Sequence, residues 1–370
     1  MKVYLDNAAT TRILDNFKDE LLEIYTNTFA NASSTHSLGK KSRYNLEKAR
    51  DILAKDLNVL SKNIFFTSGA TEANNMIIKG VALKKGKGHI ITSSIEHPSV
   101  LNVCGYLEEK GFSVSYVKPN KEGLVETESI LKEVREDTIL VSLMAVNNET
   151  GVRMPIEEVG NVLKGKNIFF HSDMTQIILR EKLDLSSFNI DGISASFHKL
   201  HAAKGCGFAY INPKFSLEKY MHGGHQEKNR RAGTENLHSI LFSAKVYEYL
   251  ANHLEENLKH IQDLRTYLEE KIAKFNGNVV INNTKHTIPH IVNIQIKGKD
   301  IEYMLPLLDM NGIYVSGGSA CQSGAMKPSN VLMDQGLTEE EAKASIRLSL
   351  SLQNTKEEID YFIEVLERII

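Results

Sequence analysis

Residues 63–72 read Asn63-Ile64-Phe65-Phe66-Thr67-Ser68-Gly69-Ala70-Thr71-Glu72. The first half is a short run of aromatic and β-branched residues, which predicts a buried strand, and the second half turns at a glycine into a stretch that predicts a helix over 71–83. This alternation repeats through the middle of the chain and predicts an α/β fold with a mainly parallel sheet covered by helices on both faces. The expected strands are 63–67, 89–93, 112–117, 138–145, 167–171, 192–196 and 207–211.

The C-terminal third of the chain has a different pattern. A helical periodicity runs over 234–275 and stops at an Asn-Gly pair, so one long helix, with or without a kink, is expected to link two domains. We expect a large domain over 15–255 and a smaller α/β domain made of 1–14 and 256–370. Further expected features are strands at 290–296, 313–316 and 345–349, and helix-starting capping boxes at Thr338-x-x-Glu341 and Thr355-x-x-Glu358.

The composition excludes several classes of protein. A net charge of −2 provides no field that would attract nucleic acid or an anionic membrane. No stretch is long and apolar enough to span a bilayer, and no apolar signal region is expected at the N-terminus. Three cysteines far apart in the sequence argue against a disulfide framework and suit a reducing cytoplasm. No CxxC or HExxH motif occurs, so no metal site is expected.

The turn at 68–72 is a candidate phosphate site. Free N–H groups and the helix dipole at such a helix start favour an anion, and the hydroxyl of Thr71 adds a donor. The alternative is a plain strand-to-helix turn in which Thr71 only caps the helix. Neither a Gly-Lys-Ser/Thr sequence nor a GxGxxG fingerprint accompanies this turn. A phosphate site here therefore points to a small phosphorylated cofactor rather than a nucleotide.

Three polar residues follow other expected strands, at the edge of the sheet where open α/β folds bind ligands. Asp173 is suited to pair with a protonated pyridine nitrogen or, alternatively, to cap a helix. Lys199 follows an apolar strand, and burial would favour its neutral amine, although most lysines at strand ends are solvated. His97 is suited to stack on a planar ring and move protons, and the alternative is an ordinary loop histidine.

Cys321 lies in Val315-Ser316-Gly317-Gly318-Ser319-Ala320-Cys321-Gln322-Ser323-Gly324-Ala325. Its small neighbours cannot pack a core and predict a mobile, exposed loop, whereas structural cysteines usually have apolar neighbours. Together with Lys199, this thiol suggests an enzyme that forms an imine at the lysine and uses the cysteine as a nucleophile. Cys104 and Cys206 lie in expected helix and strand surroundings and are interpreted as core residues.

Eight short motifs occur in the order that one family uses. They are Tyr4-Leu5-Asp6-Asn7-Ala8-Ala9-Thr10-Thr11, Phe66-Thr67-Ser68-Gly69-Ala70-Thr71-Glu72, Val146-Asn147-Asn148-Glu149-Thr150-Gly151, Asp173-Met174-Thr175-Gln176, His198-Lys199, Gly233-Thr234-Glu235-Asn236, Gly318-Ser319-Ala320-Cys321 and Ile346-Arg347-Leu348-Ser349-Leu350. The chain resembles, over nearly its whole length, the cysteine desulfurases of the NifS/IscS type, within the class V aminotransferase group of fold-type I enzymes that use pyridoxal 5′-phosphate (PLP).

The resemblance implies a role for each motif residue. Lys199 would hold PLP through an imine, His97 would stack on the PLP ring, and Cys321 would accept sulfur. Arg347 would bind the substrate carboxylate, a task suited to its bidentate guanidinium. Thr234 would reach the site from the partner subunit of a homodimer. The implied cofactor-binding residues are Lys199, Ala70, Thr71, His97, Asn147, Asp173, Gln176, Ser196, His198 and Thr234, and Asn147 would also lie near the substrate.

The implied reaction removes sulfur from L-cysteine, leaving L-alanine and a persulfide on Cys321 for an acceptor protein in iron–sulfur cluster assembly or tRNA thiolation. The alternatives are a class V transaminase or lyase that mobilises no sulfur, a selenocysteine lyase, and a degenerate paralogue without activity. Phe197 before His198, the Ala202-Ala203 pair, His225 and Ser351 depart from the family pattern. These departures bear on substrate choice more than on the cofactor.

Overall fold

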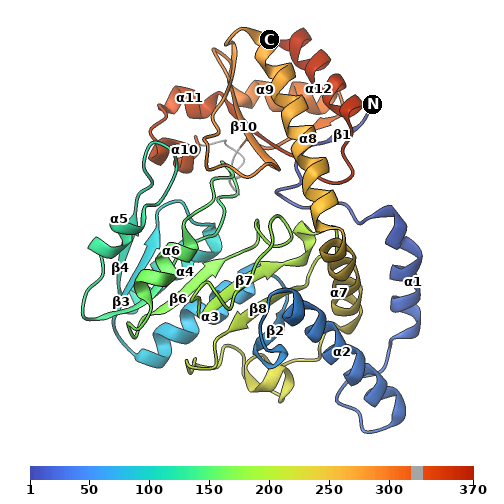
Figure 1. Ribbon diagram of the computed structural model, residues 1–370, viewed down its shortest axis with the longest axis vertical. Helices are drawn as coiled ribbons and strands as arrows, with labels where there is room; N and C mark the ends of the chain where they lie inside the picture. The colour runs from blue at the N-terminus through green and yellow to red at the C-terminus, as the bar shows by residue number, and fades with distance from the viewer. Residues whose placement is uncertain (318–327) are drawn as a thin grey trace.

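The computed structural model describes residues 1–317 and 328–370 (Figure 1). Its central sheet contains β2 (Ile64–Thr67), β3 (His89–Ser93), β4 (Ser113–Val117), β5 (Thr138–Ser142), β6 (Phe169–Asp173), β7 (Gly192–Ser196) and β8 (Gly207–Ile211). The order across the sheet is β2-β8-β7-β6-β5-β3-β4. All neighbours from β7 to β4 are parallel, whereas β8 runs antiparallel to both β2 and β7. The predicted seven-stranded, mainly parallel sheet is confirmed.

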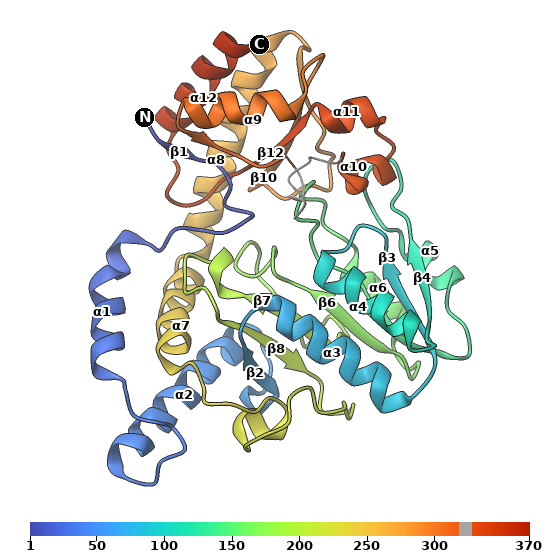
Figure 2. The ribbon, with the colours of Figure 1, turned by 180° about the vertical axis from the view of Figure 1, so that it is seen from behind.

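Helices cover both faces of this sheet, as Figures 1 and 2 show from opposite sides. Ile90 and Leu140 pack on one face against α3 (Ala70–Lys85) and α4 (Pro98–Glu109), whereas the adjacent Ile91 and Val141 belong to the core on the other face. Successive side chains of a strand point to opposite faces, so a strand with both faces covered is apolar throughout. The second face packs against α2 (Ser37–Asp56), α6 (Ile156–Leu163) and α7 (Leu237–Asn252).

The single helix expected over 234–275 is two helices. Asn236 caps the start of α7, and α8 (Leu254–Ile272) begins after His253, whose backbone leaves the helical region at φ −114° and ψ 20°. The short turn η5 (Ala273–Phe275) then ends at Asn276 in the left-handed conformation that terminates helices. Periodicity alone cannot reveal the one-residue break, because the apolar spacing continues across it.

The C-terminal part has its own hydrophobic core, which α8, α9 (Ile301–Met310) and α12 (Lys356–Ile369) build on a small sheet. This sheet has the order β12 (Ser345–Ser349), β10 (Ile291–Ile296), β9 (Val279–Ile281) and is antiparallel. β1 (Val3–Tyr4) pairs in parallel with β11 (Ile313–Tyr314), so the N-terminus joins this part of the chain. The domain boundaries given above stay a prediction.

The remaining helices are short. They are η1 (Asp15–Phe17), α1 (Lys18–Asn27), η2 (Ser61–Asn63), α5 (Thr127–Lys132), η3 (Phe197–Lys199), η4 (Gln226–Asn229), α10 (Asn330–Gln335) and α11 (Glu339–Lys343). Both predicted capping boxes are present, at the starts of α11 and α12. Cys104 and Cys206 are buried, as expected. Within residues 1–317 and 328–370, no helix combines the length and the apolar character that a membrane span requires.

A buried ion pair anchors the turn that precedes Thr234. Arg50 is 2% exposed and its Nη1 and Nη2 lie 2.8 and 2.9 Å from the two carboxylate oxygens of Glu227. Glu227 also accepts the backbone N–H of Phe66 on β2, at 2.9 Å. Glu227 and the two residues after it have positive φ angles of 43°, 55° and 65°. Left-handed backbone is unfavourable for side-chain-bearing residues, so these contacts hold a strained turn against the sheet.

We expect Glu227→Ala to lower the free energy of unfolding by about 3 kcal/mol or more, because it leaves the buried guanidinium of Arg50 without its carboxylate. Glu47→Ala is the matched control, since Glu47 contacts Nε of the same guanidinium at 3.3 Å but is 44% exposed. Its loss should cost less than about 1 kcal/mol. Urea unfolding followed by circular dichroism measures both changes, and equal destabilisation by the two variants would contradict this account.

Candidate active site

A cavity of about 810 Å³ lies at the carboxyl ends of the parallel strands, and Ser316, Asn330 and Arg347 from the C-terminal part contribute to its wall. This is the edge of the sheet at which open α/β folds bind ligands. Nine of the residues predicted from the sequence line it together: Ala70, Thr71, His97, Asp173, Gln176, Ser196, His198, Lys199 and Arg347.

One end of the cavity is formed by the start of α3. Gly69 precedes the helix with φ 155° and no side-chain cap, and the free backbone donors of Ala70 and Thr71 have no acceptor within the described part of the chain. Ser196 faces the same turn, because a Cβ added at Gly69 would lie 3.4 Å from its Oγ. An uncapped helix start beside a hydroxyl is suited to bind a phosphate.

Asp173 ends β6 with its side chain 6% exposed. One carboxylate oxygen accepts the backbone N–H of Thr175 at 3.0 Å, and the other accepts Nδ2 of Asn74 at 2.7 Å. Two donors stabilise the ionised form of this buried carboxylate. Asp173 therefore presents a carboxylate, held by these two donors, to the cavity.

Lys199 follows β7 within the turn η3, and its Nζ donates to the backbone carbonyls of Ala8 and Ala9 at 2.5 and 2.6 Å. Burial, with the charge of Arg347 as the next cause, lowers the pKa of this amine to about 8 against the opposing effect of Asp6 and Asp173. A lysine with this pKa has a substantial neutral fraction near physiological pH, which a nucleophile or a base requires.

His198 attaches the same turn to the N-terminal segment, and Gln176 attaches the segment that follows β6 to it. Nδ1 of His198 lies 3.2 Å from the hydroxyl of Thr10, and Nε2 of Gln176 donates to the carbonyl of Ala8 at 3.0 Å. Burial, with the charge of Lys199 as the next cause, lowers the pKa of His198 to about 4. His198 is therefore neutral at physiological pH and offers hydrogen bonds rather than charge.

Arg347 lies on β12 opposite Lys199. Its Nη2 pairs with Asp6 at 2.7 Å, its Nη1 donates to the carbonyl of Asn148 at 2.8 Å, and its side chain is 5% exposed. Its Nε is buried and lacks an acceptor among the residues described. A guanidinium held at two corners with one free donor is suited to bind a carboxylate that enters the cavity.

Two further predicted residues, Asn147 and Thr234, lie outside the cavity lining. The side chain of Asn147 is fully buried outside the cavity lining, where it accepts N–H groups of Glu149 and Thr150 and donates to the carbonyl of Ile95. Thr234 is exposed and also lies outside the lining. Cys321 lies outside the described residues.

Sequence reasoning missed three residues that contact the site. Asp6 was quoted only as part of a motif, and Asn74 and Glu96 received no role. Glu96 lines the cavity beside His97 with its carboxyl group buried, and burial raises the pKa of Glu96 to about 8. One signal was available for Asn74, which is a polar residue among Ala73, Met76 and Ile77 on an otherwise apolar helix face.

Comparison with known proteins agrees with this geometry. The model of the family described as aminotransferase class-V matches residues 3–362. The chain belongs to the class-V aminotransferase family. Among curated members, the cysteine desulfurase IscS of Clostridium botulinum is 41% identical, with 100% of this chain and 94% of that protein covered. The cysteine desulfurase IscS of Methanosarcina thermophila is 39% identical, with 100% and 92% covered.

Solved class-V structures share the fold. A NifS-like protein superposes with a TM-score of 0.93 at 37% identity and covers 100% of this chain and 99% of its own. A structure of SspA in complex with cysteine gives a TM-score of 0.84 at 32% identity, covering 96% of this chain and 100% of its own. These likenesses confirm the predicted resemblance and the fold-type I architecture.

Proposed function

We propose that this protein is a PLP-dependent cysteine desulfurase that removes sulfur from L-cysteine, releases L-alanine and transfers the sulfur to Cys321. The observation that carries the proposal is one cavity in which Lys199, with a pKa of about 8, lies with the carboxylate of Asp173 and the partly free guanidinium of Arg347. The full-length similarity to cysteine desulfurases supports this choice among class-V activities.

The residues of the cavity fit PLP. The uncapped start of α3 and Ser196 would hold its phosphate, Lys199 would bind it covalently, and Asp173 would pair with its ring nitrogen. When bound, PLP supplies an electron sink that makes a proton on the α-carbon of an amino acid removable. The ring of His97 borders the same space.

Residues of the chain would remove the α-proton and accept the sulfur. The neutral amine of Lys199 takes the α-proton, and the carbonyls of Ala8 and Ala9 are placed to accept hydrogen bonds from the resulting ammonium. The thiolate of Cys321 attacks the substrate sulfur and forms the S–S bond of a persulfide. The electron pair of the broken C–S bond stays with the carbon, which becomes the methyl group of alanine after protonation.

We expect Arg347→Lys to raise the KM for L-cysteine about 10- to 100-fold, because a point charge replaces a guanidinium that is already oriented by Asp6. Arg12→Lys is the matched control, since Arg12 is 67% exposed at its side chain and lies outside the cavity. Steady-state alanine formation measures both variants. An unchanged KM in Arg347→Lys would remove Arg347 from substrate binding.

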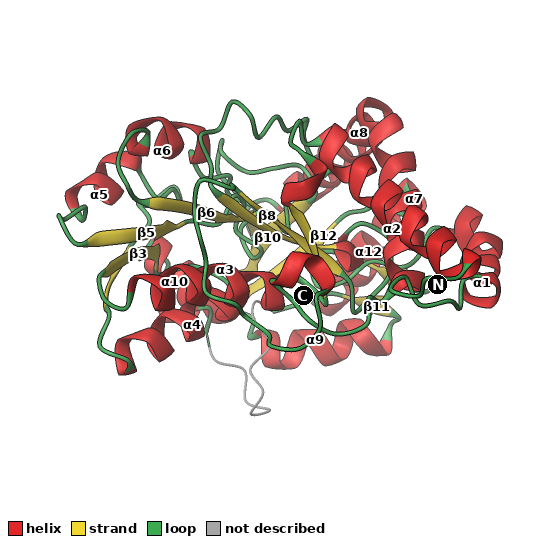
Figure 3. Ribbon diagram, turned by 90° about the horizontal axis from the view of Figure 1, so that it is seen from below, coloured by secondary structure: helices red, strands yellow, loops and turns green. Residues whose placement is uncertain are grey.

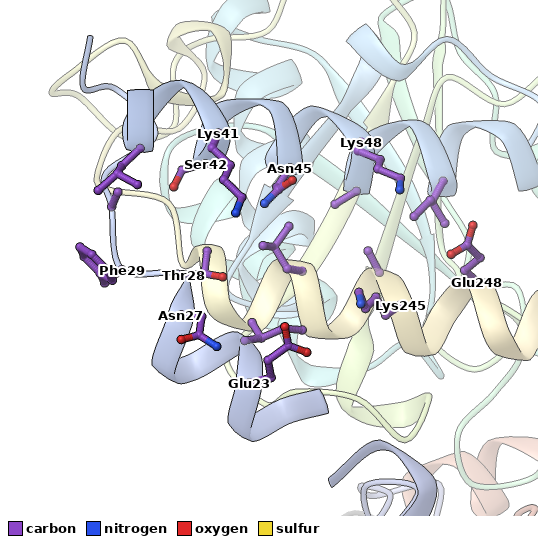
Figure 4. Close-up of a pocket in the computed structure, with 17 residues that line it drawn as sticks. Glu23, Asn27, Thr28, Phe29, Lys41, Ser42, Asn45, Lys48, Lys245 and Glu248 are labelled. Carbon is purple, nitrogen blue, oxygen red and sulfur yellow. The ribbon is translucent and has the colours of Figure 1, made fainter. Parts of the chain in front are cut away.

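A homodimer is part of the proposal. A groove of about 390 Å³ lies between α1, α2 and α7, with Ile24, Ala49 and Leu241 among its apolar lining residues (Figure 4). Large apolar side chains are exposed on α1, on α2 and on the segment between them: Leu22, Tyr25, Phe29, Leu38 and Tyr44. Such a surface favours a protein partner. In this proposed dimer, Thr234, which precedes α7, would reach the cavity of the other subunit.

The proposed setting is the cytoplasm, in keeping with the free, buried thiols of Cys104 and Cys206. The proposed partner is a sulfur-acceptor protein of iron–sulfur cluster assembly or tRNA thiolation, as the IscS names of the relatives suggest.

The test of the function is product analysis with L-cysteine and a reductant. A desulfurase gives alanine and sulfide in equal amounts. A transaminase would instead need a keto acid and release no sulfide, and a selenocysteine lyase would turn over L-selenocysteine but not L-cysteine. Either of these outcomes would contradict the proposal.

A further inference from the structure

A chain of buried hydrogen bonds joins Asp173 to His97 beneath the cavity. Nδ2 of Asn74 lies 2.7 Å from the carboxylate of Asp173 and 2.8 Å from Oγ of Ser99. The hydroxyl of Ser99 in turn lies 2.8 Å from Nδ1 of His97, and the backbone N–H of Ser99 donates to the same nitrogen at 3.1 Å. Asn74 is fully buried and Ser99 nearly so.

Only one set of hydrogen positions satisfies this chain. The two hydrogens of the Asn74 amide go to Asp173 and to Ser99, because the reversed amide would place its oxygen against an ionised carboxylate. Ser99 therefore accepts from Asn74 and donates its own proton to Nδ1 of His97. Nδ1 receives two donors and carries no hydrogen, so the neutral imidazole carries its hydrogen on Nε2.

We propose that Asn74 is a positioning residue that fixes two groups of the site at once: the carboxylate of Asp173 and, through Ser99, the tautomer of His97. The inference rests on the proposed function only where it assigns a reaction to Asp173 and His97; the hydrogen-bond chain itself does not depend on that function. It assigns His97 a neutral ring with an Nε2–H donor.

The two N–H donors of the Asn74 amide are the part of this side chain that the site uses. Its Oδ1 is buried and has no hydrogen-bond donor among the residues that the structure describes. A side chain present only to fill space would be better apolar, because a buried polar atom without a partner is unfavourable. Asn74 therefore leaves one polar atom unsatisfied while its Nδ2 connects α3 to β6 and to the start of α4.

The surroundings of His97 oppose its protonation. Protonation at Nδ1 would break both hydrogen bonds from Ser99. The walls of the cavity lower the pKa of His97 by desolvation, with Asp173 opposing this and the Lys199 charge adding to it. Among the residues that the structure describes, the other titratable groups near this ring are Glu149, His198 and Glu96, which precedes His97 in the sequence.

The test replaces Asn74 by aspartate, which keeps the shape but cannot donate to Asp173 while ionised. The hydroxyl of Ser99 would turn to the new carboxylate, leaving Nδ1 of His97 with the backbone donor alone. We expect the pKa of His97 to rise by about one unit or more, so the acid limb of kcat/KM moves to higher pH. Asn75→Asp is the matched control, because Asn75 donates only to the carbonyl of Thr71 in its own helix.

The direct readout is the 15N NMR spectrum of histidine-labelled holoenzyme. In the wild type and in Asn75→Asp, Nδ1 of His97 should be the unprotonated nitrogen and Nε2 the protonated one. Asn74→Asp should keep the ring of His97 doubly protonated to a higher pH than the wild type, because only the backbone N–H of Ser99 still donates to Nδ1. If Asn74→Asp does not fold, Ser99→Ala should also keep the ring doubly protonated to a higher pH, since it removes the hydroxyl donor to Nδ1 and leaves the backbone donor.

An unchanged His97 spectrum in a folded Asn74→Asp or Ser99→Ala protein would overturn the inference, as would a wild-type ring protonated on Nδ1. Because the spectrum needs no turnover, the outcome is separate from the proposed function. A shifted protonation of His97 in the variants, without sulfide release from L-cysteine by the wild type, would leave this inference intact and overturn the desulfurase assignment alone.

Discussion

Lys199→Ala is expected to abolish the visible absorbance of covalently bound cofactor and to reduce alanine formation by about 10³-fold or more, because it removes both the attachment point and the base. Absorbance of the purified protein and steady-state product formation measure the two effects. Lys182→Ala is the matched control, since Lys182 is exposed and lies outside the cavity. A Lys199→Ala protein that kept the absorbance would remove this lysine from the site.

The same lysine sets a pH dependence. Burial places the pKa of Lys199 at about 8, below its ordinary value, so its neutral amine prevails above that pH and the ammonium below it. Only the neutral amine forms a covalent bond with an aldehyde. The rate at which cofactor-free protein takes up PLP should therefore rise through about pH 8 and then level off, as stopped-flow absorbance would show.

Cys321→Ala is expected to leave the cofactor absorbance unchanged and to lower alanine formation from L-cysteine by about 10³-fold or more, since no other described thiol faces the cavity. Cys104 and Cys206 are buried, and burial raises the pKa of both thiols to about 12, so neither supplies a thiolate at physiological pH.

Cys104→Ala serves as the matched control and should retain activity. Alanine formation by the three proteins at equal cofactor content is the measurement. Wild-type rates of alanine formation in Cys321→Ala would show that a nucleophile other than Cys321 takes the sulfur, and would contradict sulfur transfer to Cys321.

Much of the fold could be predicted because its signals are local. Six of the seven strands of the central sheet are short runs that are buried along their whole length, whereas β4 at its edge is partly exposed. The starts of α11 and α12 follow capping boxes, as at Thr355. The break at His253 could not be predicted, since it interrupts one residue of an otherwise continuous apolar pattern.

The site was predictable where one residue type performs one task at a strand end, as for Asp173 and Lys199. The contacts that hold these site residues in place could not be predicted. Asp6 meets Arg347 across 341 positions of sequence, and Asn74 meets Asp173 across 99. Such pairs arise only when β1 joins the C-terminal part and α3 packs on the sheet. Local patterns carry no information on those long-range contacts.

The most direct test of the desulfurase assignment is a single turnover with L-cysteine that carries isotopically labelled sulfur, followed by peptide mass spectrometry without reductant. We predict one labelled sulfur atom on the peptide that contains Cys321, together with one equivalent of alanine. Labelled sulfide in solution with an unmodified Cys321 peptide, or a labelled sulfur on Cys104 or Cys206, would contradict the account.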